Sequence, residues 1–352
     1  MEEFVRVEWL IVTGCFLGSL LLTPLIRHYA RCRHLVDVPN TRSSHARPTP
    51  RGGGLAIAVS CIAGLVILTC LHRFPFDLFS TLTGAGILVA AVGFMDDHVD
   101  ISARWRVLAH FAAAVWIVIS FNGFFMQYRP SPSEWFLDLF WIISIVWLIN
   151  LYNFMDGIDT IAGAEAVFVS ISATALFAAG GEYGMASAAA LLTVAVGGFL
   201  FWNLPPARIF MGDVGSGFIG VVIGAFALAG IKHGTISIWV WLILLGVFLV
   251  DSTITVGRRI MRGQKWYSAH RSHAYQHGAR RLGSHGKVTA IVTGINVFWL
   301  FPWALAAYRW PNLGPLFALF AYIPLLWLVV RIGAGIDETM KHDTLGFSQK
   351  GV

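Results

Sequence analysis

The chain has 352 residues, of which 57% are hydrophobic and only 12% charged, and its formal net charge is +6. Apolar runs of about 20 residues, enough to cross a bilayer, recur from end to end. This composition excludes a soluble globular protein, and no segment between the runs is long enough to form a second core. We therefore expect an all-α polytopic membrane protein with a single integral domain over residues 1–352.

The hydropathy pattern predicts about eleven transmembrane helices. They cover residues 6–27, 54–72, 78–95, 106–121, 136–153, 160–180, 184–203, 214–231, 236–257, 288–307 and 313–331. Only five of the 25 lysines and arginines fall on the side opposite to loops 30–53, 96–105, 153–160, 204–213 and 258–287. Because basic loops are retained in the cytoplasm, we expect these loops and the C-terminus to be cytoplasmic and the N-terminus to lie outside.

The first basic loop, from Asp37 to Gly54, contains many hydrogen-bond donors, among them Ser44 and His45, and it ends in three glycines. Backbone amides can approach an anion closely at such glycines. The same composition also suits a plain connector with basic residues at the membrane surface, so the loop alone does not distinguish the two.

Two adjacent carboxylates, Asp96 and Asp97, end the third predicted helix. Negative charge at a helix C-terminus opposes the helix dipole, so helix stability does not explain the pair, whereas metal binding or acid–base chemistry does. Arg104 and Arg106 follow at the start of the next helix. They either hold a phosphate or mark the inner leaflet.

Asn150, Asn153, Asp156 and Asp159 recur every three residues and therefore share one side of a helical path. We expect a helix ending near Asn153, a turn through Gly157, and a new helix capped by Asp159. Capping accounts for Asp159 alone. The other polar side chains at a membrane boundary need partners, which favours a functional cluster.

Asp213, within Phe210-Met-Gly-Asp-Val-Gly-Ser216, opens the eighth predicted helix. That position suits a helix cap as well as a metal ligand. However, Asp96, Asp97 and Asp156 are expected on the same face, and four uncompensated carboxylates would repel one another. Hard oxygen ligands of this kind indicate Mg²⁺ or Mn²⁺.

The last large loop contains His270, Arg271 and His273, which offer donors to phosphate or sugar hydroxyl groups. Zinc binding is disfavoured, because no cysteine or acidic residue lies at ligand spacing. Asp251, inside the ninth predicted helix, is expected to pair with one of the arginines that follow at 258 and 259.

With these motifs in order, residues 35–290 resemble the polyprenyl-phosphate N-acetylhexosamine-1-phosphate transferase superfamily of membrane enzymes. The resemblance implies Mg²⁺-dependent transfer of a sugar-1-phosphate from a UDP-N-acetylhexosamine to undecaprenyl phosphate, with release of UMP, at the cytoplasmic face of the bacterial inner membrane. It implies contact with membrane lipid but not with nucleic acid, and it leaves a homodimer open.

The resemblance also assigns roles by motif position. It implies that Asp213 binds the metal and that Asp96 and Asp97 act on the reacting lipid phosphate. We also expect Asn153 to share in metal binding, and Arg104 and Arg106 to bind the lipid phosphate. For the nucleotide-sugar it implies contacts with Asn153 and Asp156, and with Asp159 and Phe210 at the uracil. We also expect contacts of the nucleotide-sugar with Asn150, Ser44, His45, His270, Arg271 and His273.

One departure concerns the sugar donor. The branch that uses muramyl-pentapeptide carries three consecutive histidines in its last cytoplasmic loop, where this chain has His270-Arg-Ser-His273. We therefore expect a donor such as UDP-GlcNAc or a UDP-6-deoxy-HexNAc, as in enzymes that initiate O-antigen or related surface glycans.

The reaction route stays open at this point. A phosphate monoester is already mostly dianionic at neutral pH, so in a single displacement Asp97 either orients the lipid phosphate or acts as a base. A double displacement through an aspartyl phosphate is the other route.

A different class of protein, an ion-coupled transporter, would also need acids in the membrane. The acids here cluster at helix ends on one side, and the chain has no visible repeat, which disfavours transport.

Overall fold

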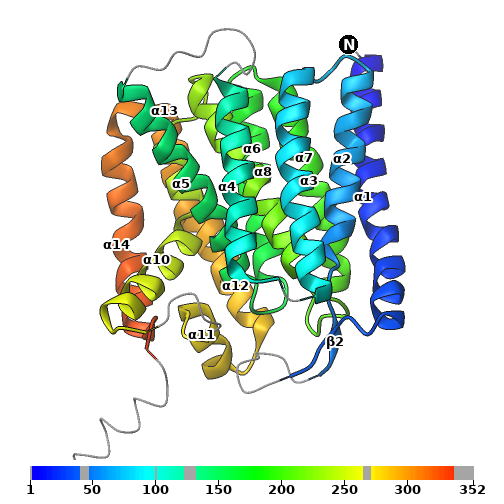
Figure 1. Ribbon diagram of the computed structural model, residues 1–352. Helices are drawn as coiled ribbons and strands as arrows, with labels where there is room; N and C mark the ends of the chain where they lie inside the picture. Colours follow the sequence, from blue (N-terminus) through cyan, green and yellow to red (C-terminus); the bar gives the residue numbers. More distant parts are fainter. Residues whose placement is uncertain (1, 40–46, 100, 123–131, 265–270, 337–352) are drawn as a thin grey trace, which may run out of the picture.

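The computed structural model describes residues 2–39, 47–99, 101–122, 132–264 and 271–336 as a bundle of helices (Figure 1). The predicted site residues Ser44, His45 and His270 lie outside these ranges. In chain order the helices are α1 (Glu2–Cys32), α2 (Gly54–Cys70), α3 (Phe76–Val99), α4 (Ala103–Phe121), α5 (Pro132–Met155), α6 (Ile161–Ala179), α7 (Tyr183–Asn203), α8 (Gly212–Lys232), α9 (Ile238–Leu244), α10 (Gly246–Met261), α11 (Ala274–Leu282), α12 (His285–Ile295), the π-helix η1 (Asn296–Leu300), α13 (Phe301–Arg309), the 3₁₀ turn η2 (Pro311–Leu313) and α14 (Gly314–Ile332).

The prediction of an all-α polytopic membrane protein is confirmed. Within the described ranges, nine helices are long and apolar enough to cross a membrane, or ten if the bent pair α9 and α10 counts as one span. The apolar helix α2 is shorter, at 17 residues. Apart from 236–257, the predicted spans lie on helix except for one or two residues at some of their ends, so these positions along the chain are right.

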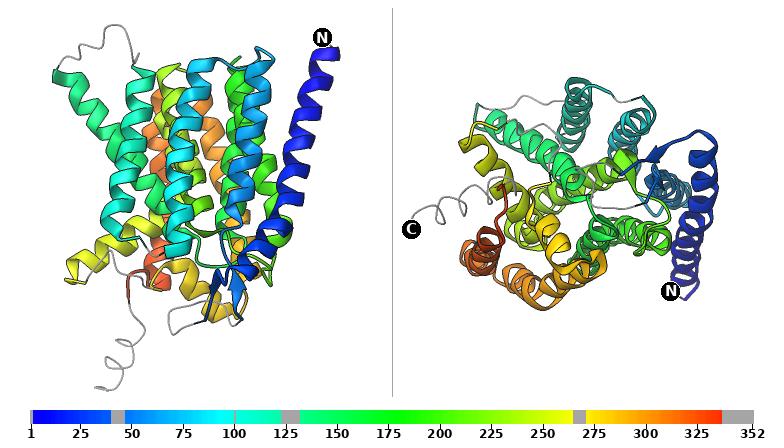
Figure 2. Two further views of the ribbon diagram at one scale, coloured as in Figure 1. Left: turned by 45° about the vertical axis from the view of Figure 1, so that its right-hand side comes forward. Right: turned by 90° about the horizontal axis from the view of Figure 1, so that it is seen from below.

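α8 lies at the centre of the bundle, and 89% of its apolar span is buried among the other helices. It packs on α2, α3 and α5, and these contacts depend on small residues that let backbones approach. Gly54 of α2 meets Gly215 of α8 so closely that a Cβ at residue 54 would collide with the Gly215 Cα. Seen from below, α1 and α14 lie on the periphery of the bundle (Figure 2).

The ninth predicted helix, 236–257, is wrong as a single straight span. It is broken at Leu245 into α9 and α10, whose axes differ by 77°. Hydropathy does not report a bend of this kind, because both halves of the segment are apolar. The second half runs outward at the lower end of the bundle in Figure 1.

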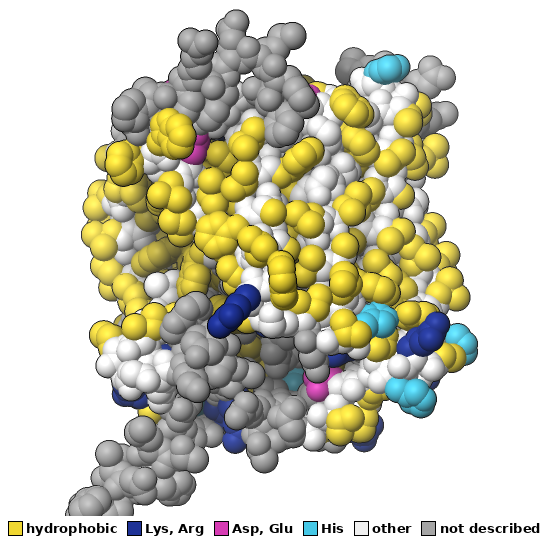
Figure 3. Space-filling model, in the orientation of Figure 1, with side chains coloured by type: hydrophobic (Ala, Val, Ile, Leu, Met, Phe, Trp, Pro, Cys, Tyr) yellow, Lys and Arg dark blue, Asp and Glu magenta, His cyan; other side chains and the backbone are white. Residues whose placement is uncertain are grey.

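The described parts of the loops that were predicted to be cytoplasmic gather at one end of the molecule. The strands β1 (Val36–Asp37) and β2 (Thr49–Pro50), which pair antiparallel, lie at the lower end with α11 (Figure 1). Figure 3 shows hydrophobic side chains over the middle of the bundle and basic side chains gathered below them. α1 begins at the upper end and α14 finishes at the lower end, as an odd number of crossings requires.

Candidate active site

Arg106 lies between two carboxylates that are far apart in the sequence. Its Nη1 is 2.8 Å from Oδ2 of Asp96 and 2.8 Å from Oδ2 of Asp213. Asp96 Oδ1 also accepts a hydrogen bond of 2.6 Å from the Ile101 amide. The end of α3, the start of α4 and the start of α8 therefore meet at one cationic group, at the place where the sequence predicts a divalent cation.

Asp97 occupies a tight backbone cradle and is only 3% exposed. Its Oδ1 is 3.4 Å from the Asp213 amide nitrogen, and Arg51 Nη2 donates to its main-chain carbonyl at 2.8 Å. The cradle needs glycine at 212, where φ is +73° and a Cβ would lie 2.5 Å from Asp97 Oδ2. Asp97 Oδ2 itself has no hydrogen-bond partner among the described residues, so one buried oxygen remains available to a ligand.

Asn150 and Asn153 line a small cavity between α3, α4, α5 and α8. The cavity has a volume of about 90 Å³, and its walls also include Arg106, His110 and Asp213. Asn153 Nδ2 donates to Ser216 Oγ at 3.4 Å, whereas Asn150 Nδ2 donates to the Val146 carbonyl at 2.7 Å and lies 3.4 Å from His110 Nδ1. The cavity thus leads from the carboxylates into the membrane-spanning part of the bundle.

His110 is a residue that the sequence analysis missed. It stands one helical turn after Arg106 on α4, so the two side chains share a face and both reach the same cavity. That spacing is visible in the sequence. In contrast, Arg104 is exposed and lies two residues before Arg106, on another side of the helix.

Asp156 lies in the turn after α5 and is half-buried. Its carboxylate has no hydrogen-bond partner among the described residues, and the charges of Asp213, Asp97 and Asp159 act on it. Burial, followed by these three neighbouring charges, raises the pKa of Asp156 well above its usual range. The predicted concentration of negative charge at this end of the bundle is therefore present.

Asp159 does not cap the following helix, contrary to the expectation. α6 begins at Ile161 with no side-chain cap, and Thr160 before it has a left-handed backbone, with φ of 73°. Asp159 Oδ2 instead accepts from the Ala207 amide at 3.1 Å and lies 3.3 Å from His285 Nδ1. The carboxylate therefore ties the loop after α7 to the start of α12.

Phe210 is held beside the glycine-rich end of the first loop. Its amide donates to the Pro50 carbonyl at 2.8 Å, and its carbonyl accepts from the Gly53 amide at 2.9 Å. The segments around 50–54 and 210–213 thus run side by side, and both border Asp97 through Gly52 and Gly212. Two of the predicted motifs are in direct contact here.

Asp251 does not pair with Arg258 or Arg259, as the sequence had suggested. Its Oδ1 is 3.3 Å from His273 Nδ1, and its carboxylate accepts hydrogen bonds from backbone amides of α11. Arg258 Nη1 donates to the Ala334 carbonyl, and Arg259 Nη1 lies 3.4 Å from Ser272 Oγ. His273 is therefore buried, while Arg271 is exposed.

The donor set agrees chemically with a hard divalent cation. No three His, Cys, Asp or Glu side chains within the described ranges are arranged to hold a metal as they stand. However, Asp97 has an unpartnered buried oxygen, and Asp213 and Asn153 offer oxygens on the same cavity. Such oxygens are the ligands that Mg²⁺ prefers, and Arg106 supplies the positive charge between Asp96 and Asp213 in this structure.

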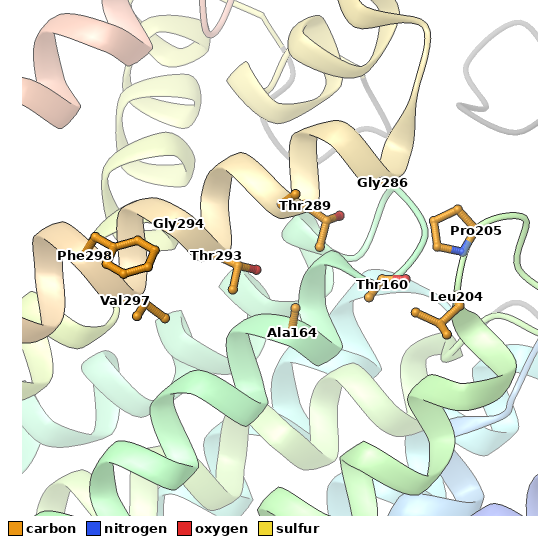
Figure 4. Close-up of a pocket in the computed structure, with 11 residues that line it drawn as sticks. Thr160, Ala164, Leu204, Pro205, Gly286, Thr289, Thr293, Gly294, Val297 and Phe298 are labelled. Carbon is orange, nitrogen blue, oxygen red and sulfur yellow. The ribbon is translucent and has the colours of Figure 1, made fainter.

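A second cavity, of about 530 Å³, lies beside the site (Figure 4). It is formed by α6, α12, η1 and the segment directly after α7, and it borders Thr160 next to the Asp159–His285 contact. Its lining is mainly apolar and consists of Thr160, Ala164, Leu204, Pro205, Gly286, Thr289, Ala290, Thr293, Gly294, Val297 and Phe298. None of the predicted site residues lines this cavity.

The sequence matches the family model described as Glycosyl transferase family 4 over residues 79–231. This region begins in α3 and ends in α8, so it contains Asp96, Asp97, the 150–159 segment and Asp213. The family match therefore coincides with the part of the chain in which the structure gathers the carboxylates.

Curated relatives extend the similarity beyond that region. The chain is 28% identical over 357 aligned positions to a probable undecaprenyl-phosphate N-acetylglucosaminyl 1-phosphate transferase of Bacillus subtilis, covering 97% of this chain and 96% of the relative. It is 25% identical to an undecaprenyl-phosphate alpha-N-acetylglucosaminyl 1-phosphate transferase of Thermotoga maritima, covering 78% and 83%. A phospho-N-acetylmuramoyl-pentapeptide-transferase of Fervidobacterium nodosum is 31% identical over a shorter region, 51% of this chain and 58% of the relative.

Proposed function

Since this chain belongs to the polyprenyl-phosphate N-acetylhexosamine-1-phosphate transferase superfamily, we propose that it transfers an N-acetylhexosamine-1-phosphate from a UDP-sugar to undecaprenyl phosphate and releases UMP. The single observation that best supports this reaction is the contact of Arg106 with Asp96 and Asp213, beside the buried Asp97. A phosphoryl-transfer site needs cations and positioned acids of this kind where charge develops.

The proposed reaction is a displacement at phosphorus. An oxygen of the lipid phosphate bonds to the β-phosphorus of the UDP-sugar, and the bond from that phosphorus to the bridging oxygen of the UMP moiety breaks. The lipid phosphate has a second pKa near 6, so at neutral pH it is mostly dianionic and needs little help from a base. Bringing two anionic groups together is therefore the main difficulty.

Arg106 is suited to reduce that repulsion. Its guanidinium has several N–H donors, of which only Nη1 contacts Asp96 and Asp213, so the group can offer further donors to a phosphate oxygen. His110 and Asn150 stand deeper in the same cavity. We propose that the lipid phosphate enters along this cavity and that Arg106 binds it.

Asp97 is suited to orientation. The Asp213 amide and Arg51 fix its position, and its second oxygen has no described partner. We propose that Asp213 and Asn153 hold Mg²⁺, with Mn²⁺ as a substitute, and that Asp156, Asp159 and Phe210 contact the nucleotide-sugar. When bound, the metal supplies positive charge against the pyrophosphate oxygens.

We further propose UDP-GlcNAc or a UDP-6-deoxy-HexNAc as donor, and a product that initiates O-antigen or a related surface glycan. The Bacillus subtilis and Thermotoga maritima relatives, which cover 97% and 78% of this chain, carry N-acetylglucosaminyl transfer in their names, which supports the first donor. The site end of the bundle would face the cytoplasm of a bacterial inner membrane, with the N-terminus outside. The basic side chains gathered at that end support this orientation (Figure 3).

The test is UMP release by the purified protein in detergent with undecaprenyl phosphate and a panel of UDP-HexNAc donors. We expect release that depends on both substrates and on Mg²⁺, with the donor ranking read directly from initial rates. Asp138→Asn is a matched control, because Asp138 contacts Asn122 away from the site and its loss of charge should not matter. Failure of every donor to release UMP would reject the proposal.

A further inference from the structure

The bent helix α10 carries a buried carboxylate close to its start. Asp251 is 2% exposed, and it stands six residues after the break at Leu245. Its Oδ1 accepts from the Ala274 amide at 2.8 Å and from Thr255 Oγ1 at 3.1 Å, and its Oδ2 accepts from the Tyr275 amide at 3.0 Å. These contacts, together with His273 Nδ1, account for the partners of a charge that burial would otherwise make costly.

Three of the four donors belong to the start of α11. The first amides of a helix have no partner within the helix, and a negative charge there interacts favourably with the helix dipole. Asp251 thus acts as a cap supplied by another helix, 23 residues before Ala274. As a result, the position of α11 depends on α10.

The start of α11 also contacts the segment that follows α5. Tyr275 Oη donates to the Phe154 carbonyl at 2.9 Å, and the Tyr275 ring stacks on His273 with 5.6 Å between the ring centroids. Any side chain at Gly157 would collide with Tyr275 Oη. The Tyr275 side chain is therefore seated on the turn that carries Asp156.

From these contacts we propose that Asp251 is a positioning residue for the nucleotide-sugar side of the site. The chain of contacts runs from the Asp251 carboxylate to the α11 amides, and from Tyr275 to Phe154 and Gly157. Asp251 touches none of the residues proposed to meet the lipid phosphate, so it should affect the donor and not the acceptor. This inference rests on the proposed function for the identity of the donor, but the docking of α11 does not.

The Asp251→Asn variant separates charge from shape. An asparagine has one acceptor oxygen, and the amide nitrogen that replaces the other oxygen cannot accept a hydrogen bond. Three donors converge on Oδ1, so the asparagine oxygen should remain there and the Tyr275 amide should lose its partner. We expect amide hydrogen exchange in peptides covering 272–282 to accelerate at least tenfold, with exchange in α8 unchanged.

In UMP-release assays the same variant should raise the KM for the UDP-sugar about tenfold and leave the KM for undecaprenyl phosphate within twofold. Asp138→Asn serves again as the control for loss of one carboxylate. Unchanged exchange in 272–282, or an equal rise in both KM values, would overturn the inference. If the wild-type protein releases no UMP, the proposed function fails, while the exchange measurement still decides whether Asp251 docks α11.

A second variant covers the case in which Asp251→Asn does not fold. Tyr275→Phe keeps the Asp251 carboxylate and the ring, and it removes only the hydroxyl group, which donates to the Phe154 carbonyl and lies against Gly157. We expect a threefold or larger rise in the KM for the UDP-sugar and no change in the acceptor KM. An unchanged KM for the UDP-sugar would show that the seating of α11 on this turn does not position the donor.

Discussion

Replacement of Asp213 by asparagine tests whether the charge at the start of α8 serves the reaction or only the helix. The change keeps the shape of the side chain. α8 begins at Gly212 with no side-chain cap hydrogen bond, so Asp213 does not cap the helix, and its structural contribution there is the modest interaction of a first-turn charge with the helix dipole. What the variant removes is the charge that lies 2.8 Å from Arg106 Nη1.

The expected effect on folding is small. The Asp213 side chain is 30% exposed and that of Arg106 is 34% exposed, and solvent-screened pairs of this kind contribute about 0.5–1 kcal/mol. Loss of repulsion with Asp97 and Asp156 offsets part of that amount. We therefore expect the unfolding midpoint of the variant to fall by no more than about 2–4 °C.

The expected effect on turnover is much larger. If Asp213 holds Mg²⁺, its neutralisation removes charge stabilisation from the reacting phosphate groups, and the loss of one such contact costs roughly 10²–10³ in turnover. UMP release and thermal unfolding should be measured on the same detergent preparation over a range of Mg²⁺ concentrations, with Asp138→Asn beside it. Turnover within threefold of wild type, with the same Mg²⁺ dependence, would reduce Asp213 to a counter-ion for Arg106.

Three further predictions follow from the same geometry. In UMP-release assays, Arg106→Ala should raise the KM for undecaprenyl phosphate and lower turnover about 100-fold, and Arg106→Lys should recover part of both losses. Equal activity of the wild-type protein and the two variants would contradict a phosphate contact. The pKa of Asp156 is raised in the folded protein. At pH values between its ordinary and its raised pKa, the folded protein keeps a proton on Asp156 that the unfolded chain has released. The contribution of Asp156 to the free energy of unfolding therefore falls as pH rises through that window. Asp156→Asn should therefore be more stable than wild type in EDTA, by a margin that grows from about pH 4 upward; a margin that shrinks with pH would refute the assignment. In a cysteine-free background, Tyr183→Cys should react with an impermeant thiol reagent in intact cells, and Arg33→Cys only after the cytoplasmic face is opened; the reverse pattern would invert the proposed topology.

The gathering of the carboxylates could be predicted from the sequence, because it follows from topology. The distribution of lysine and arginine assigns loops to faces, and every second loop must then meet at one end of the bundle. Asp96, Asp97 and Asp213 are close for that reason, although more than 100 residues separate the pair from Asp213. No detail of side-chain contact was needed.

The rotation of each helix was not predictable in the same way. Arg104 and Arg106 are equivalent in the sequence, and only the packing of α4 against α3 and α8 turns the second one toward the carboxylates. The same rotation of α4 places His110 on the cavity, since His110 lies one turn after Arg106 on the same face of the helix. The conformation of the turn at Asp159 was also not predicted, because the left-handed backbone of Thr160 directs the chain away from the geometry of a helix cap.

Asp251 shows why the remaining error arose. Within one apolar run, the arginines at 258 and 259 are the only charged partners that a sequence displays, and an acid in a membrane segment is expected to have a charged partner. The backbone amides at the start of a helix satisfy a carboxylate equally well, yet they carry no signature in side-chain type. After the break at Leu245, α10 lies against the start of α11, and the amides of Ala274 and Tyr275 reach the carboxylate first. A buried acid near a helix break should therefore be examined for helix starts as well as for arginines.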